Sequence, residues 1–175
     1  MRVFGIAGWS GSGKTTLMER LLPELVRRGA RVSTVKHAHH AFALDRPGKD
    51  SHRHRTAGAA EVLVASGGRW AVLHELRDEP EPPLPYLLSR LAPVDLVLVE
   101  GFKRFPLPKL EVHRPVVGKP LLCGGDPHVV AVASDAALAG LPVPLLALDD
   151  VAAVADLALR AACPVAALAG GGQDG

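Results

Sequence analysis

Residues 8–15 of this chain read GWSGSGKT and fit the phosphate-binding loop pattern G-x-x-x-x-G-K-[ST]. The preceding residues, 2–7, are short and apolar enough for a buried strand, and residues 14–28 place leucines at helical spacing. A glycine-rich turn between a strand and a helix directs backbone N–H groups and the positive end of the helix dipole at a phosphate. The motif therefore predicts an α/β fold with a phosphate site at the end of the first strand.

The polar side chains of the motif have predicted roles. Lys14 would neutralise the β- and γ-phosphates of a nucleotide, and the Thr15 hydroxyl would ligate Mg²⁺. Lys14 is therefore a candidate catalytic residue. The predicted nucleotide-binding residues of the loop are Gly8, Trp9, Ser10, Gly11, Ser12, Gly13, Lys14, Thr15 and Thr16.

The rest of the chain alternates strand-like and helical segments. Strands are predicted at residues 31–36, 95–101, 109–113, 129–133 and 144–147, and helices at residues 50–57, 86–91 and 151–162, the last capped by Asp149. Strand–helix–strand units join parallel strands. The predicted fold class is α/β, a three-layer P-loop NTPase-type domain with a mostly parallel sheet. Two strand-like runs flank Gly67 and Gly68, which predicts a β-hairpin extension.

Length and composition narrow the class of protein. A chain of 175 residues, 48% hydrophobic and 22% charged, is typical of one soluble domain. We predict a single nucleotide-binding domain over residues 1–165 and a flexible glycine-rich tail over 166–175. A net charge of +2 predicts no nucleic-acid and no membrane partner. Neither Cys123 nor Cys163 lies in a C-x-x-C pair, so reduced thiols and a cytoplasmic location are expected.

Acidic residues supply the remaining Mg²⁺ candidates. Glu100 ends an apolar strand, where phosphate-loop proteins usually carry an Asp that holds Mg²⁺ directly or through water. Glu100 is thus the second candidate catalytic residue and a metal ligand beside Thr15; the alternative is a solvated strand end. The following Gly101 would permit close approach to the γ-phosphate. Asp50 is the preferred further metal ligand and Asp45 the second choice, although Asp50 could instead cap a helix.

Basic residues and histidines surround the same predicted edge of the sheet. Imidazoles bind Zn²⁺ or Ni²⁺ well, but a histidine cluster without cysteine more often has a structural or ligand-contacting role. The alternative for the basic residues is a solvated face. The histidines of the cluster are His37, His39, His40, His52 and His54. The residues predicted to meet a second anionic ligand or a partner are Lys36, His37, Lys49, Arg53 and Lys103.

The guanine-reading sequence N-K-x-D is absent from the chain. Asp135 follows the predicted strand 129–133 and could accept hydrogen bonds from N1 and N2 of guanine instead. An aspartate after a strand is also often a cap, so both roles stay open.

Several stretches together resemble one protein family. They are GWSGSGKTTL at 8–17, VKHAHH at 35–40, DRPGKDS at 45–51, AGA at 57–59, DLVLVEGFK at 95–103 and PKLEVHR at 108–114. On these residues the chain resembles the MobB family, the molybdopterin-guanine dinucleotide biosynthesis adaptor proteins. The KHxHH and PGKDS segments are more specific than the phosphate loop, and the resemblance runs over nearly the whole chain.

The resemblance implies a GTP-binding protein of the molybdenum cofactor pathway that assists the guanylyltransferase joining GMP to molybdopterin. It also implies a homodimer with weak GTPase activity and a β-extension in the dimer contact, for which the Gly67–Gly68 hairpin is the candidate. In that setting Glu100 is the metal-linked acid and Asp135 the guanine reader. The implied ligands are GTP, Mg²⁺ and molybdopterin or its guanine dinucleotide, and the basic cluster would suit the pterin phosphate or the transferase.

Three other functions share these features. A metallochaperone-type GTPase would bind Ni²⁺ or Zn²⁺ through the histidines. A small-molecule kinase would use the same loop and fold, but no arginine-rich lid segment is evident. A pure adaptor would bind nucleotide with little or no turnover.

Overall fold

A computed structural model describes residues 1–38 and 45–170 of the chain. The chain folds into two compact units. The first comprises residues 1–37 and 83–175, and the second comprises residues 38–82.

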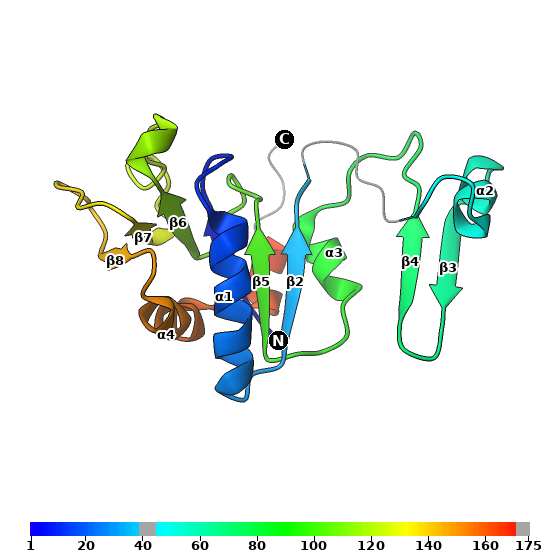
Figure 1. The fold of residues 1–175 in the computed structure, drawn as a ribbon, viewed down its shortest axis with the longest axis horizontal. Coiled ribbons are helices and arrows are strands. Elements are labelled where there is room, and N and C mark those ends of the chain that lie inside the picture. Colours follow the sequence, from blue (N-terminus) through cyan, green and yellow to red (C-terminus); the bar gives the residue numbers. More distant parts are fainter. Residues whose placement is uncertain (39–44, 171–175) are drawn as a thin grey trace. The chain divides into compact units, whose positions relative to one another are not determined.

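The first unit is built on a seven-stranded sheet (Figure 1). Its main path runs β2-β5-β1-β6-β7-β8, and every pair along that path is parallel. The strands are β1 (Arg2–Ala7), β2 (Val32–Lys36), β5 (Leu96–Glu100), β6 (Lys109–His113), β7 (Val129–Ser134), β8 (Leu145–Ala147) and β9 (Cys163–Pro164). The short β9, which the sequence patterns did not predict, pairs antiparallel with the start of β1. The predicted mostly parallel sheet is confirmed.

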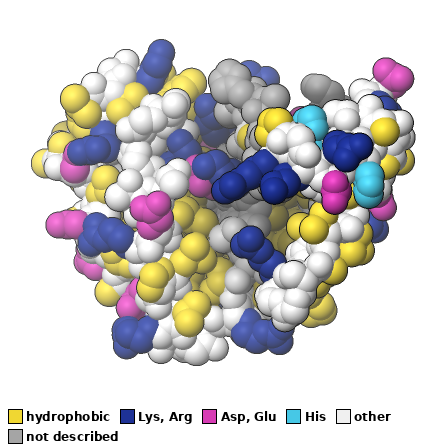
Figure 2. All heavy atoms as spheres, turned by 45° about the vertical axis from the view of Figure 1, so that its right-hand side comes forward, with side chains coloured by type: hydrophobic (Ala, Val, Ile, Leu, Met, Phe, Trp, Pro, Cys, Tyr) yellow, Lys and Arg dark blue, Asp and Glu magenta, His cyan; other side chains and the backbone are white. Residues whose placement is uncertain are grey.

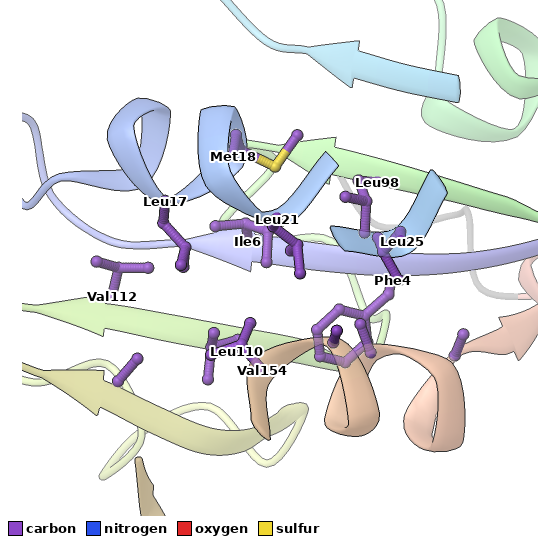
Figure 3. Packing of buried hydrophobic residues seen from close by; sticks show 14 of the residues in the cluster. Phe4, Ile6, Leu17, Met18, Leu21, Leu25, Leu98, Leu110, Val112 and Val154 are labelled. Carbon is purple, nitrogen blue, oxygen red and sulfur yellow. The ribbon is translucent and has the colours of Figure 1, made fainter. Parts of the chain in front are cut away.

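Alternate residues of the central strands are buried in two different hydrophobic clusters, because successive side chains point to opposite faces of a sheet. Phe4 and Ile6 of β1 pack in one cluster with α1 (Lys14–Arg27) and α4 (Val151–Ala161) (Figure 3). Val3 of β1 packs in the other, with α3 (Leu84–Ser89) and the 3₁₀ helix η2 (Val165–Gly170). Helices therefore cover both faces, which confirms the three-layer α/β class.

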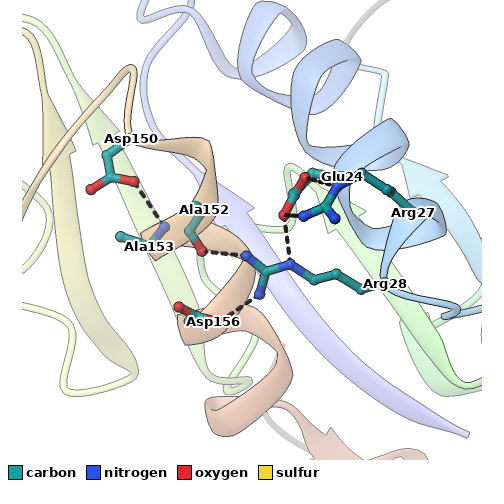
Figure 4. Close-up of polar contacts among 7 residues, drawn as sticks. All are labelled: Glu24, Arg27, Arg28, Asp150, Ala152, Ala153 and Asp156. Atoms are coloured by element: carbon teal, nitrogen blue, oxygen red, sulfur yellow. Dashed lines mark hydrogen bonds and ion pairs between the residues drawn. The ribbon is translucent and has the colours of Figure 1, made fainter.

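The two helices on the first face are also joined by polar contacts (Figure 4). Glu24 of α1 accepts hydrogen bonds from Arg27 and Arg28, which lower the pKa of its carboxyl to about 2. Arg28 in turn pairs with Asp156 of α4 and donates to the carbonyl of Ala152 at 3.1 Å. These contacts link the last turns of α1 to one side of α4.

The prediction that Asp149 caps α4 is wrong. The N-cap is Asp150, whose carboxylate accepts a hydrogen bond from the N–H of Ala153 at 3.0 Å. An N-cap side chain reaches the N–H groups two and three residues ahead of it. The helix begins at Val151, so only Asp150 stands in that position.

The second unit confirms the predicted hairpin. β3 (Glu61–Ala65) and β4 (Trp70–His74) pair antiparallel as a separate two-stranded sheet, preceded by α2 (Asp50–Thr56). Arg55 of α2 pairs with Asp45 at 3.1 Å and with Glu75 at 3.3 Å, and its hydrogen bonds lower the pKa of Asp45. The helix and the ends of the hairpin region are thus held by ion pairs more than by apolar burial.

The predicted flexible tail covers residues 166–175. The predicted tail begins within η2, where Leu168 is buried against the second hydrophobic cluster.

The face shown in Figure 2 carries Lys and Arg side chains with acidic side chains between them. None of the helices described here is long and apolar enough to cross a lipid bilayer.

Candidate nucleotide site

The loop between β1 and α1 has the backbone that its glycines predict. Gly8, Gly11 and Gly13 have φ of 143°, 80° and 94°, values that other residues rarely adopt. A Cβ on Gly8 would stand 2.4 Å from the carbonyl oxygen of Val112, so the loop is packed against β6 there. Gly13 is the N-cap of α1 and supplies no side-chain cap. The N–H groups of the first turn are therefore left for a ligand or for water.

Lys14 is folded back onto this loop. Its ammonium donates a hydrogen bond to the carbonyl of Trp9 at 2.8 Å. Burial lowers the pKa of Lys14, and the charges of Lys103 and Lys36 act in the same direction while Glu100 opposes them. An anion bound among these three ammonium groups would relieve their repulsion.

The end of β5 brings acid and hydroxyl together. The Thr15 hydroxyl donates to Glu100 Oε1 at 3.2 Å, and Lys36 Nζ lies 3.7 Å from the same oxygen. The contact between Lys36 and Glu100 follows from the sheet, since the two residues are register partners on the parallel strands β2 and β5. Glu100 thus lies beside the loop, as the sequence predicted for a metal-linked acid.

Ser12 adds an unsatisfied group to the loop. Ser12 is 2% exposed, and its Oγ has no hydrogen-bond partner. Among the described residues, it is the one buried side-chain nitrogen or oxygen atom in that situation. A buried hydroxyl without a partner costs about 1–3 kcal/mol, so this hydroxyl would gain by binding a ligand oxygen or water.

A cavity of about 620 Å³ opens beside the start of α1. It extends from Gly13 and Thr16 to the residues that follow β7 and to β8, and Asp135 lines it. Two of the predicted phosphate-loop residues, Gly13 and Thr16, therefore line one cavity with Asp135, the predicted base reader. Asp135 is paired here with Arg114, whose Nε lies 2.6 Å from Oδ2.

Comparison with known proteins now identifies the family. The family model described as molybdopterin guanine dinucleotide synthesis protein B matches residues 3–135. This chain belongs to the MobB family.

The relatives cover most of the chain. The molybdopterin-guanine dinucleotide biosynthesis adapter protein of Escherichia coli (strain K12) is 46% identical over 161 residues, 90% of this chain and 91% of that protein. The protein of the same description from Haemophilus influenzae is 48% identical over 136 residues, 76% of this chain and 74% of that protein. A crystal structure titled molybdopterin-guanine biosynthesis protein B matches with a TM-score of 0.71 and 30% sequence identity. The match covers 90% of this chain and 97% of that chain.

Trp9 has a role in this MobB chain that the sequence analysis missed. Its indole N–H donates to the carbonyl of Pro120 at 2.7 Å, and the ammonium of Lys103 lies 4.3 Å from the ring centroid. Lys103 is placed by the buried Lys109, which donates to its carbonyl at 2.8 Å and pairs with Asp126 at 2.7 Å. The predicted Lys103 thus lies at the phosphate loop.

The closest neighbour of Gly101 is a side chain. A Cβ on Gly101 would stand 2.9 Å from the Cβ of His37, and φ there is 98°. The His37 ring lies 4.6 Å from that of Phe102. Gly101 therefore accommodates His37, and its close approach to the γ-phosphate stays a prediction.

Three further predicted residues, Lys49, Asp50 and Arg53, belong to the second unit. Asp50 is the first residue of α2, so its predicted alternative as the N-cap is wrong; Lys49 is the N-cap. The Asp50 side chain is exposed and lies 3.9 Å from Arg53. Asp45, the second choice as a metal ligand, is instead held by Arg55.

The histidine cluster falls partly outside the described residues, which do not include His39 and His40. Within residues 1–38 and 45–170, no group of three His, Cys, Asp or Glu side chains is placed to hold a metal ion.

Proposed function

We propose that this protein is a GTP-binding adapter with weak GTPase activity that acts in the cytoplasm in molybdopterin guanine dinucleotide synthesis. The observation that carries the proposal is that Lys14, Thr15 and Glu100 meet at the phosphate loop, whose Gly13 and Thr16 line a cavity together with Asp135. The descriptions of the family and of its relatives supply the pathway. The proposed ligands are GTP and Mg²⁺, with molybdopterin or its guanine dinucleotide as the proposed second ligand.

The oxygen atoms at the end of β5 fit a small hard cation. Thr15 Oγ1 and Glu100 Oε1 lie 3.2 Å apart, and Mg²⁺ takes one or two protein oxygens beside phosphate oxygens and water. Thr15 and Glu100 would hold Mg²⁺, whose charge would stabilise negative charge on the β- and γ-phosphates. Asp50 stays a proposed further ligand.

The remaining residues bind and orient the nucleotide. The ammonium of Lys14 would leave the Trp9 carbonyl for the phosphates, and the first-turn N–H groups of α1 and the Ser12 hydroxyl would complete the cradle. Asp135 would accept from N1–H and N2–H of guanine at the other end.

The hairpin is the proposed homodimer contact. Leu63, Trp70 and Val72 lie on one face of the hairpin and are 65%, 69% and 40% exposed. An exposed apolar face on a two-stranded sheet needs cover, because such a sheet is marginally stable alone. The basic residues Lys36, His37 and Lys103, with Lys49 and Arg53 of the second unit, are the proposed contacts to the pterin phosphate or to the guanylyltransferase.

Calorimetric titration with GTP and ATP, each with and without Mg²⁺, tests the proposal. We expect Mg²⁺-dependent preference for GTP and hydrolysis slower than about 1 s⁻¹. Lys14→Ala should weaken GTP binding by about a hundredfold without changing thermal stability. ATP preference would indicate a kinase instead.

The acid and the base reader need separate variants. Glu100→Ala should weaken the Mg²⁺ dependence, and Glu19→Ala, which removes an exposed carboxylate from α1, is the matched control. Asp135→Asn should narrow the preference for GTP over ATP. An unchanged Mg²⁺ titration would remove Glu100 from the site, and an unchanged preference would remove Asp135.

A further inference from the structure

Arg114 and Asp135 stand side by side because of strand register. β6 and β7 are parallel neighbours in which His113 is opposite Ser134. The residues that follow them, Arg114 and Asp135, therefore leave the sheet at adjacent positions, and their side chains pair at 2.6 Å. The two side chains are 42% and 37% exposed. Ion pairs this open to water are weak and easily exchanged.

Arg114 also reaches toward the phosphate end of the cavity. Its Cδ lies 3.8 Å from the position that a Cβ on Gly13 would occupy. Gly13 is the N-cap of α1, where the phosphates are proposed to bind. Arg114 and Asp135 line the same cavity as Gly13. The arginine side chain therefore extends from the phosphate end to the carboxylate proposed to read the base.

The pair and a bound guanine compete for one carboxylate. Reading both N1–H and N2–H uses one acceptor site on each oxygen of Asp135, and Arg114 already donates to Oδ2. A guanine base seated on both oxygens would crowd the guanidinium at Oδ2 and favour its release. The guanidinium would then lie close to the phosphate groups, for which its planar set of donors is well suited.

We propose that Arg114 is a specificity-determining residue that couples base reading to phosphate binding. Without nucleotide it holds Asp135; with GTP it exchanges that carboxylate for a phosphate. This proposal rests on the proposed function, in which Asp135 reads guanine. A nucleoside that breaks the pair gains no phosphate contact in return, so the exchange favours guanine nucleotides that carry phosphates over guanosine.

The exchange predicts opposite effects on two ligands. In Arg114→Ala, guanosine no longer has to break the ion pair and should bind about threefold or more tightly, while GTP loses a phosphate contact and should bind about tenfold more weakly. Arg114→Lys should restore much of the GTP affinity, because an ammonium also pairs with phosphate.

Arg20→Ala is the matched control. Arg20 lines the same cavity, carries the same charge and donates to the carbonyl of Asp149 at 3.1 Å, not to Asp135. Loss of this charge should change the affinities for guanosine and for GTP in the same direction, or change neither.

The measurement is competition against a fluorescent GTP analogue, with saturation-transfer NMR for guanosine in the millimolar range and thermal unfolding of each variant. Tighter guanosine binding together with weaker GTP binding in Arg114→Ala, and restored GTP binding in Arg114→Lys, support the exchange. Equal weakening of both ligands, or no change in either, overturns it and leaves Arg114 a structural partner of Asp135. Asp135→Asn is measured in parallel. If Asp135→Asn leaves the ratio of GTP affinity to ATP affinity unchanged, Asp135 does not read the base and the proposed function fails at that point. If Asp135→Asn changes that ratio but Arg114→Ala shows no opposite effects on guanosine and GTP, only the exchange fails.

Discussion

The two units of this chain bury apolar surface to very different extents. In the first unit, apolar side chains fill both faces of a parallel sheet, and even buried charges such as Lys109 and Glu111 have partners. Among the described residues of the second unit, Val62 is the one hydrophobic residue that is buried, while Leu63 and Trp70 are exposed to solvent. A nucleotide site needs a rigid sheet edge, whereas a contact surface needs exposed apolar area. The contrast therefore supports the two proposals, that the first unit binds nucleotide and that the second is the homodimer contact.

The largest expected effect breaks the first unit. Leu21→Ala removes a fully buried side chain between α1 and the sheet and should cost about 2–5 kcal/mol of unfolding free energy. Urea unfolding in a Trp70→Phe background follows Trp9 and so reports on this unit. A loss below about 1 kcal/mol would contradict the packing in Figure 3.

The second prediction concerns the exposed hairpin face. Trp70→Ser should abolish dimerisation in sedimentation velocity while leaving the unfolding of the first unit, followed by Trp9 fluorescence, within about 0.5 kcal/mol. Tyr86→Ser, which removes a half-exposed aromatic ring from α3, is the control and should leave the dimer intact. A dimer that survives Trp70→Ser would show that the apolar face has another role.

A smaller effect distinguishes the two aspartates before α4. Asp150→Ala should cost about 1 kcal/mol, because the N–H of Ala153 loses its acceptor. Asp149→Ala should cost less, since the structure gives its side chain no capping bond. Equal losses of stability in thermal unfolding would mean that both carboxylates serve the helix end.

The smallest effect is a pH dependence of the hairpin. His74 lies between Glu61 at 2.9 Å and Glu79 at 3.5 Å, and the hydrogen bond that its Nδ1 donates to the Glu61 carboxylate is the main cause that raises its pKa above 6.5. The charged form is therefore favoured in the folded state. Its stabilisation is complete below the unfolded pKa and is lost as pH rises through the raised folded value.

Trp70 fluorescence in a Trp9→Phe background measures this dependence. The melting temperature of the hairpin should fall as pH is raised from about 6.5, and His74→Gln should remove that fall. A hairpin whose melting temperature rises over the same range would reverse the sign of the argument.

Much of the fold followed from local patterns. The apolar runs that form β1, β5, β6 and β7 are predictable within a residue or two, and so are α1 and the hairpin. The two-residue β9 escapes prediction because it carries no periodic signal; it exists only because β1 offers an open position beside it. Asp149 and Asp150 are equally plausible caps in sequence, because the choice between adjacent caps depends on the residue at which the helix starts.

The candidate site divides in the same way. Lys14, Thr15 and Glu100 were predicted together, since a phosphate loop and a strand-end acid meet wherever the two strands are parallel neighbours. The contacts of Trp9 with Pro120 and of Arg114 with Asp135 were not predicted. Each joins residues far apart in the chain and has no motif of its own.

The sequence by itself determined the phosphate loop, the acid beside it and the α/β class, because glycine conformation, helix starts and strand periodicity are short-range properties of the chain. Only the tertiary structure decided that Arg114 holds Asp135, that Trp9 is tied to Pro120 and that Asp45 pairs with Arg55. The first two pairings depend on the order and register of strands and on packing between distant segments, and the third depends on how the chain between Asp45 and Arg55 folds. Residue spacing encodes none of these.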